Sequence, residues 1–173
     1  MENTKIKRVT VNEIDQLQKI GRQTFAETFS SGNSEENMKD YLEKGFSTEK
    51  LTTELVDKNS EFYFALTDNR VIGYLKVNVG QSQTEIKDEN ALEIERIYVL
   101  KEFHGKKVGQ LLYDKAMEVS LQRNVDYVWL GVWEENSRAL KFYKKNGFVE
   151  FSKHIFRLGN DEQTDIMMKL HLK

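Results

Sequence analysis

The hydrophobic positions of this chain change their period several times, and each change predicts a new structural element. Near the N-terminus Ile14, Leu17, Ile20 and Phe25 recur at the spacing of an amphipathic helix. After residue 61 apolar and polar residues alternate, which is typical of β-strands. The predicted order is one strand, three helices, a hairpin, a strand–loop–helix unit, a strand–helix unit and a final pair of strands.

The predicted strands span residues 6–9, 62–66, 71–77, 92–99, 125–132, 148–156 and 166–172. The first predicted helix follows a capping box at residues 10–13 and ends at a break near residue 31. A third helix begins after residue 47, and the other helices are predicted over residues 35–44, 109–123 and 137–145. Asp68 and Asn69 predict a hairpin turn, and the polar segment 80–90 is predicted to be a mobile loop. The pattern indicates a mixed α/β sheet in a single domain, residues 1–173.

Composition narrows the function classes. With 39% hydrophobic and 31% charged residues the chain has the make-up of a globular protein. A net charge of −2 gives no argument for a nucleic-acid partner. The absence of cysteine excludes disulfides and a cysteine nucleophile. No apolar run reaches about 18 residues and no secretion signal is recognisable, so we expect no membrane partner and a cytoplasmic location.

The segment from Leu92 to Gly109 carries the first functional signal. A short strand ends in a glycine-containing turn that opens a helix, which gathers free backbone N–H groups at the positive end of the helix dipole. Such a turn suits a phosphate or pyrophosphate. Strand alternation places Glu93 and Glu95 on one face, together with Ile97 and Val99. The pattern predicts an enzyme with a phosphorylated cofactor and two candidate bases.

A second block strengthens this interpretation. The turn reads His104-Gly-Lys-Lys-Val-Gly109, and Asn136-Ser-Arg-Ala139 with Tyr143 and Gly147-Phe148 follows further along the chain. In this order the blocks resemble the GNAT superfamily of N-acetyltransferases, which use acetyl-CoA. The resemblance covers roughly residues 92–148 and implies the GNAT fold, a mixed, mostly antiparallel sheet of six to seven strands with helices on both faces. His104 replaces the usual Gln or Arg. Lys107 stands where glycine is common, so its backbone is expected to avoid positive φ.

The resemblance also implies how acetyl-CoA is held. Main-chain groups of Ile97, Tyr98 and Val99 would pair with the pantetheine arm like one more strand. Backbone N–H groups of the turn would bind the pyrophosphate, from Gly105, Lys106, Lys107, Val108, Gly109 and Gln110. Asn136 would contact the pantetheine, and Lys145 would approach the adenine-ribose phosphate.

Amine acetylation needs a base and an acid. A primary amine has a pKa of about 10.4 and must lose a proton before it attacks a thioester. Glu93 and Glu95 are the candidate bases. The resemblance places Tyr143 near the thioester sulfur, where its phenol can protonate the departing thiolate, and the Val99 N–H is a candidate for stabilising the oxyanion. The three histidines show no metal-ligand spacing, so no metal is expected.

The N-terminal half narrows the resemblance to PaiA-type polyamine acetyltransferases, through motifs such as Thr24-Phe-Ala-Glu-Thr-Phe29 and Ile94-Glu-Arg-Ile-Tyr-Val99. Acidic residues of this helical region are candidates for attracting spermidine or spermine, namely Glu27, Glu35, Glu36 and Asp40. The acceptor is then a small-molecule amine. Acetylation of a protein N-terminus or lysine, or of an aminoglycoside-like amine, stays open, as does a non-catalytic CoA-binding regulatory module. The oligomeric state is also open, and a homodimer is one of the states considered.

Overall fold

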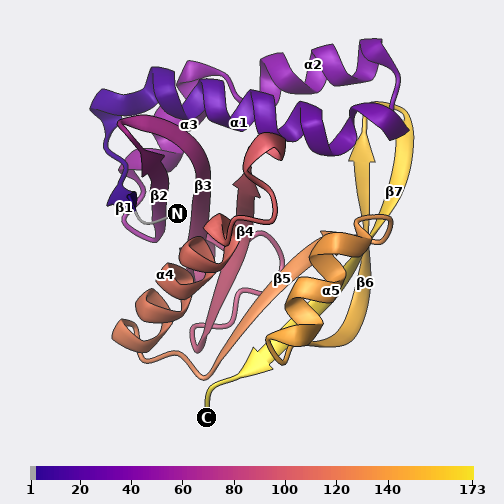
Figure 1. Ribbon diagram of the computed structural model, residues 1–173. Coiled ribbons are helices and arrows are strands. Elements are labelled where there is room, and N and C mark those ends of the chain that lie inside the picture. The colour runs from indigo at the N-terminus through magenta and orange to yellow at the C-terminus, as the bar shows by residue number, and fades with distance from the viewer. Residues whose placement is uncertain (1–2) are drawn as a thin grey trace.

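A seven-stranded mixed sheet forms the centre of the computed structural model, which describes residues 3–173 (Figure 1). The strands are β1 (Thr4–Arg8), β2 (Ser60–Thr67), β3 (Arg70–Val79), β4 (Ala91–Val99), β5 (Tyr127–Trp133), β6 (Val149–Leu158) and β7 (Asp161–His171). Their order is β1-β2-β3-β4-β5-β7-β6, and neighbouring strands of the described chain are antiparallel except β4 and β5. The predicted fold class is confirmed.

Helices cover both faces of the sheet. They are α1 (Ile14–Phe29), α2 (Glu35–Gly45), α3 (Thr48–Val56), α4 (Val108–Gln122) and α5 (Ser137–Lys145). Successive residues of a strand point to opposite faces. In β3, Tyr74 reaches Gly21 of α1, whereas the position of Gly73 faces Leu112 of α4. Therefore α1 and α4 lie on opposite faces, and Figure 1 shows α2 and α3 beside α1, and α5 on the side of α4.

The predicted local signals are confirmed at the element ends. Thr10 and Glu13 form the capping box ahead of α1. The side chain of Ser47 accepts the Lys50 N–H and begins α3. Asp68 and Asn69 adopt positive φ of 51° and 65°, as a two-residue turn between β2 and β3 requires. Within residues 3–173 no helix has the length and apolar character needed to cross a membrane.

β4 and β5 separate partway along their length, which positions the site. Their pairing extends only from Ala91–Ile94 against Tyr127–Leu130. Beyond these residues β4 remains paired with β3, and β5 with β7. The main-chain groups that face the separation in each strand are therefore left without a neighbouring strand.

A β-bulge in β4 corrects one prediction of strand alternation. Val77 pairs with Ile94 and Lys76 pairs with Arg96, so Glu95 is an extra residue between them. Glu93 and Glu95 still share a face, because both accept a hydrogen bond from the Asn78 amide. Because of the extra residue, the side chains after it alternate in the opposite sense, so Arg96 and Tyr98 lie on the face of the glutamates and Ile97 and Val99 on the other. The expectation that Ile97 and Val99 share the face of the glutamates is therefore wrong.

The segment 80–90 is anchored, contrary to the expected mobile loop. Gln83 is buried; its amide donates to the carbonyls of Gly80 and Asp88, and it accepts a hydrogen bond of 2.7 Å from the Trp129 indole. The Asp88 carboxylate also accepts from the Tyr127 hydroxyl at 3.0 Å. These contacts attach the segment to β5, beside the face of the sheet that lies under α1 and α2.

Candidate active site

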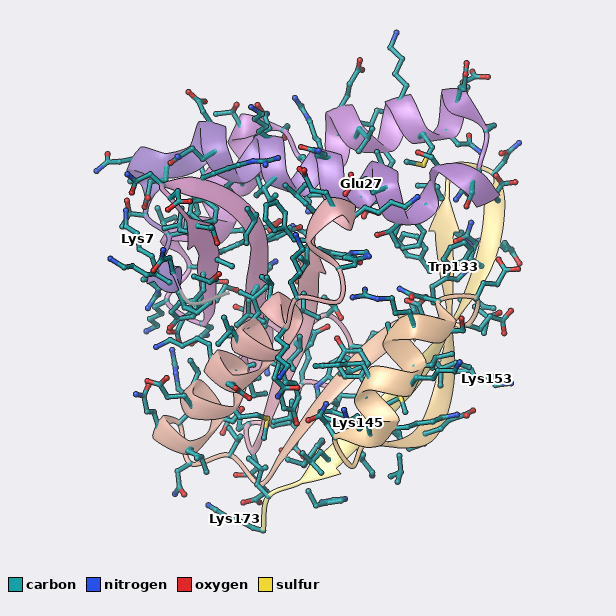
Figure 2. The ribbon with its side chains drawn as sticks, in the orientation of Figure 1. Lys7, Glu27, Trp133, Lys145, Lys153 and Lys173 are labelled. Atoms are coloured by element: carbon teal, nitrogen blue, oxygen red, sulfur yellow. The ribbon has the colours of Figure 1, made fainter. Side chains whose placement is uncertain are left out.

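Two adjoining cavities meet where β4 and β5 separate. The outer cavity, of about 830 Å³, lies between β4, α5 and the C-terminal end of α1. The inner cavity, of about 260 Å³, lies between the sheet and the helices α1 and α2. Both are lined by Tyr98, Asn136 and Tyr143. Figure 2 shows Glu27 and Trp133 near one end of the outer cavity and Lys145 near the other.

The turn before α4 contains the N–H groups that the resemblance assigns to the pyrophosphate, residues 105–110, and is called the cradle below. Among residues 3–173 the backbone N–H groups of residues 105–110 donate no hydrogen bond to another backbone group, and the first such bond of the helix comes from Leu111 to the Lys107 carbonyl. Six free donors at the start of a 15-residue helix suit a phosphate-bearing ligand. Their binding to the pyrophosphate of acetyl-CoA stays a prediction.

The departures from the common turn sequence have distinct consequences. Lys107 has a φ of 64°, so the expectation that its backbone avoids positive φ is wrong. Gly105 has a φ of 79° and takes a second left-handed position in the same turn. The His104 ring Nε2 lies 2.8 Å from the Val99 carbonyl oxygen and so connects the turn to the end of β4. Burial lowers the pKa of His104, which favours the neutral ring.

The end of β4 offers main-chain groups to the outer cavity, although not from all three predicted residues. The Leu100 N–H donates to the Ile72 carbonyl of β3. Because antiparallel hydrogen-bonded pairs alternate, Tyr98 directs its main-chain groups to β3, and Ile97 and Val99 direct theirs to the separation. Two residues can therefore pair with an extended ligand, and Tyr98 contributes its side chain.

Helix α5 supplies the opposite wall of the outer cavity. Asn136 caps this helix as predicted, with its side-chain oxygen accepting the Ala139 N–H at 3.2 Å, which leaves its NH₂ group for a ligand. The hydroxyl of Tyr143 makes no hydrogen bond within residues 3–173, and burial raises the pKa of Tyr143 well above its usual range, so the phenol stays protonated. Exposed Lys145 is the last residue of α5, at the opposite end of the helix from Asn136, and also lines the outer cavity.

Glu95 is held in ion pairs. Its carboxylate accepts hydrogen bonds from buried Lys76 at 2.7 Å and from Asn78 at 2.8 Å, and lies 3.3 Å from Arg96. Burial alone would raise the pKa of Glu95, but the Arg96 and Lys76 charges outweigh it and lower that pKa to about 2. A carboxylate with such a low proton affinity is a poor general base near neutral pH.

Glu93 has the opposite environment. It is buried and accepts hydrogen bonds from Asn78 at 3.0 Å, the Thr84 N–H at 2.8 Å and the Thr84 hydroxyl. Burial raises the pKa of Glu93, the hydrogen bonds from Thr84 and Asn78 oppose the rise, and the charge of Glu95 adds to it. Oε2 accepts only the Thr84 hydroxyl, so this oxygen keeps capacity for one more donor in the inner cavity.

Besides Glu93 and Glu95, the titratable residues of the inner cavity differ from the acidic residues that the sequence suggested for the acceptor. Glu35, Glu36 and Asp40 do not line the inner cavity, and Asp40 pairs with Lys44 on the surface of α2. Glu27 lines the outer cavity and accepts the Lys101 N–H. The inner cavity instead receives the side chains of Glu85, His154 and Asp165.

These three residues escaped prediction for separate reasons. Glu85 lies in the segment 80–90 that was expected to be mobile, and Asp165 lies in the polar first half of β7, which begins at Asp161 and not near 166. His154 shares its register position with Asp165 and lies 2.6 Å from Glu85. The available signal of an earlier strand start was that Thr164 extends the series of alternate positions Ile166 and Met168 toward the N-terminus. Among residues 3–173 no group of three or more His, Cys, Asp or Glu is arranged to hold a metal ion.

Aromatic side chains form the roof and one wall of the inner cavity. Phe29 of α1 packs against Trp133 with ring centroids 5.1 Å apart and against Phe156 at 6.0 Å. Tyr41 of α2 stacks on Phe25 at 4.3 Å and also meets Phe156. The cavity therefore combines π-faces with carboxylates, a lining that suits organic cations.

The likeness to known proteins agrees with this geometry. Residues 18–148 match the family model described as acetyltransferase (GNAT) family. An uncharacterized N-acetyltransferase of Lactobacillus delbrueckii subsp. lactis is 42% identical over 169 residues, which cover 98% of each chain. The chain belongs to the GNAT acetyltransferase family. It is therefore an N-acetyltransferase, and acetyl-CoA is its acetyl donor.

Two further relatives of this GNAT enzyme come from Thermoplasma acidophilum. A spermidine N(1)-acetyltransferase is 26% identical over 147 residues, covering 83% of this chain and 86% of the relative. The crystal structure of a PaiA N-acetyltransferase in complex with coenzyme A superposes with a TM-score of 0.80 at 23% identity, covering 97% of this chain and 98% of the other. This structural likeness supports the fold.

The outer cavity of this GNAT enzyme fits the donor. Free N–H groups at residues 105–110 suit the pyrophosphate, and the main-chain groups of Ile97 and Val99 suit the amides of the pantetheine arm. A cluster of cations lies along the cavity, consisting of Lys101, Arg138, Lys141 and Lys145. When bound, acetyl-CoA would supply an activated acyl group, and these residues would hold its phosphates and its pantetheine arm.

Proposed function

We propose that this GNAT enzyme acetylates a primary amine of a small polyamine, such as spermidine or spermine, by direct attack of the amine on acetyl-CoA. The observation that carries the proposal is the inner cavity. Its floor holds the carboxylates of Glu93 and Asp165, its walls are aromatic, and it adjoins the outer cavity at Tyr143. A lining of carboxylates and π-faces favours a ligand with several positive charges.

The size of the inner cavity also favours a slender acceptor. A volume of about 260 Å³ accommodates an unbranched chain, and it is below the roughly 300–1,000 Å³ that is usual for drug-sized ligands. Helices α1 and α2 cover this cavity with Phe25, Phe29 and Tyr41. A small cavity that two helices cover disfavours a folded protein or a bulky aminoglycoside as the acceptor.

Glu93 and Tyr143 have the complementary roles in our proposal. Glu93 takes the proton that the ammonium group must lose, because its raised pKa and its open Oε2 position suit a base. The new bond forms between the amine nitrogen and the acetyl carbon, and the bond from that carbon to sulfur breaks. Tyr143 gives its hydroxyl proton to the departing sulfur. The second proton, which the nitrogen releases as the amide forms, passes through solvent and restores the phenol. The Val99 N–H, which faces the separation, stabilises negative charge on the acetyl oxygen.

Glu95 has a structural role in this scheme. Its ion pairs with Lys76 and Arg96 hold the bulge of β4 in place beside Glu93. The homodimer, the cytoplasmic location and the single-domain organisation stay predictions.

An acceptor panel tests the proposal. Free thiol release from acetyl-CoA is measured with spermidine, spermine, an aminoglycoside and a peptide that has a free N-terminus. We expect turnover with the two polyamines and little with the peptide. Tyr143→Phe should lower kcat by about 100-fold, within the range of one general acid, with the Kd for CoA nearly unchanged. Preferential turnover of the peptide would contradict the polyamine assignment, and an unchanged kcat would remove Tyr143 as the acid.

A further inference from the structure

Asp165 occupies a distinct part of the inner cavity. It lies on β7, where it pairs with Trp133 of β5 on one side and His154 of β6 on the other. A Cβ atom built at Gly131 would lie 3.5 Å from Asp165 Oδ2. Because Gly131 has no side chain, the Asp165 carboxylate has an open approach from the cavity that both residues line.

Asp165 is the acidic residue of this cavity without a protein partner. Within residues 3–173 its carboxylate forms neither a hydrogen bond nor an ion pair, whereas Glu93 accepts three hydrogen bonds and Glu95 is ion-paired. Glu85 is paired with His154 at 2.6 Å. Burial raises the pKa of Asp165 to about 6, His154 opposes the rise and Glu85 adds to it. Burial makes the charged form of Asp165 less favourable, and a ligand cation at its open approach would offset that cost.

The position of Asp165 separates it from the reacting groups. Glu93 pairs with Trp129 of β5, and Asp165 pairs with Trp133, four residues further along the same strand. With about 3.3 Å per residue along β5, and with β4 and β7 each about 4.8 Å to one side of it, the Cα atoms of Glu93 and Asp165 are roughly 16 Å apart and their carboxylates on the order of 10–16 Å apart. The spacing is too long for both to act on one amine. It corresponds to the two ends of an extended polyamine chain.

The aromatic lining between these groups is an independent indication of a cation. Trp133, the register partner of Asp165, packs on Phe29, and Phe156 lies two residues from His154 on β6. Tyr41 and Phe29 both contact the Phe156 ring. These π-faces attract organic ammonium groups and exclude water from the methylene chain.

We propose that Asp165 is the specificity-determining residue of the acceptor site, which binds the far ammonium group of a long polyamine while Glu93 receives the reacting amine. The inference rests on the proposed polyamine acetylation and adds a length requirement to it. Asp165 contributes to binding and takes no part in bond making. The enzyme therefore favours acceptors with a second positive charge about 10 Å or more from the first over monoamines of equal length.

Matched acceptors and matched variants test this role. The acceptors are spermidine, diaminooctane and octylamine, of which the last two have similar length and differ in the far charge. The variant is Asp165→Asn, and the control is Glu162→Gln, an exposed position on the same strand that pairs with surface Arg157. We expect Asp165→Asn to raise KM for spermidine and diaminooctane about tenfold or more, with kcat retained. Turnover of octylamine should stay within about twofold, and Glu162→Gln should resemble the wild type.

The outcomes distinguish the two proposals. An equal loss with octylamine and diaminooctane, or no loss with either, would overturn the role of Asp165 and leave polyamine acetylation intact. Calorimetric titration of spermidine into the CoA complex covers the remaining case. If the wild type acetylates none of the amines but binds spermidine more tightly than Asp165→Asn does, the acceptor site stands and the proposed reaction fails. Equal binding by both proteins without turnover would overturn both proposals.

Discussion

Two glutamates on the same face of β4 have opposite proton affinities because their neighbours differ. Glu95 lies against Lys76 and Arg96, which favour the charged carboxylate. Glu93 has only neutral donors, from Asn78 and Thr84, and its burial favours the protonated form. Residue type and strand position alone therefore do not identify the base. The pKa directions support the proposed roles, with Glu93 as the base and Glu95 as a structural residue.

The two glutamates should respond differently to substitution by glutamine. The folded-state pKa of Glu95 is about 2, below its ordinary value of 4.5, so its stabilising effect is complete above pH 4.5 and is lost as the pH falls toward 2. Glu95→Gln should lower the free energy of unfolding by about 3 kcal/mol at pH 7, because it leaves two buried cations short of a partner. The loss should shrink toward pH 3. Urea unfolding at both pH values measures it.

Glu93→Gln is the matched comparison. The pKa of Glu93 is raised, so its charge opposes folding at pH 7 and this cost disappears as the pH falls below 4.5. We expect unchanged or higher stability at pH 7 together with a large loss of kcat and of the acidic limb in the pH–rate profile. A stable variant that keeps its acidic limb would show that another group accepts the proton.

At the scale of elements, the turn that begins α4 presents free N–H groups and contains a strained backbone position. The cradle requires two left-handed positions, and one of them is occupied by Lys107 with its φ of 64°. A residue with a Cβ atom in this conformation costs roughly 1 kcal/mol relative to glycine. The strained turn is maintained by the helix that follows and by the contact of His104 with the Val99 carbonyl.

Lys107→Gly should relieve this strain. Glycine also has more freedom in the unfolded chain, so we expect a net gain of a few tenths to about 1 kcal/mol in the free energy of unfolding. Lys107→Ala is the control, because it removes the same ammonium group but keeps the Cβ atom. Thermal unfolding compares the stability of the two variants, and CoA titration compares their affinity for CoA. If the alanine variant gains as much stability, relief of backbone strain is not the cause.

At the scale of the molecule, the separation of β4 from β5 turns one sheet into two partly independent halves. Direct pairing between the halves is limited to Ala91–Ile94 and Tyr127–Leu130. The outer cavity has β4 and the cradle on one side and α5 on the other, so a bound donor contacts both halves. The donor therefore acts as a tertiary link where the main-chain pairing is missing.

Binding of CoA should consequently stabilise the whole fold. At a concentration of about 100 times Kd, a ligand that binds only the folded state adds about 2.7 kcal/mol. For a chain of this size we expect Tm to rise by about 5–10 °C. Thermal unfolding with and without CoA measures the shift, and adenosine, which has no pyrophosphate or pantetheine arm, is the control ligand. An equal shift with adenosine would show that the cradle and β4 contribute little.

Much of the architecture followed from local patterns in the sequence. The helices, most strands, the Asp68–Asn69 turn and the Asn136 cap depend on periodicity and capping, which act between residues close in the chain. The cradle was predictable for the same reason, since a glycine turn and the helix after it are contiguous. The family followed from the two motif blocks in their order.

The tertiary structure decided the chemistry of the inner cavity. The bulge at Glu95 depends on pairing with β3, and the opposite pKa directions of Glu93 and Glu95 depend on Lys76, Asn78 and Thr84 from other segments. Asp165 enters the cavity only because β7 lies beside β5, far from it in sequence. The sequence by itself determined which elements form and where a turn with free N–H groups opens a helix. Contacts between distant segments decided the partners and proton affinities of Glu93, Glu95 and Asp165, on which their proposed roles depend, because proton affinity depends on burial and on the charges nearby.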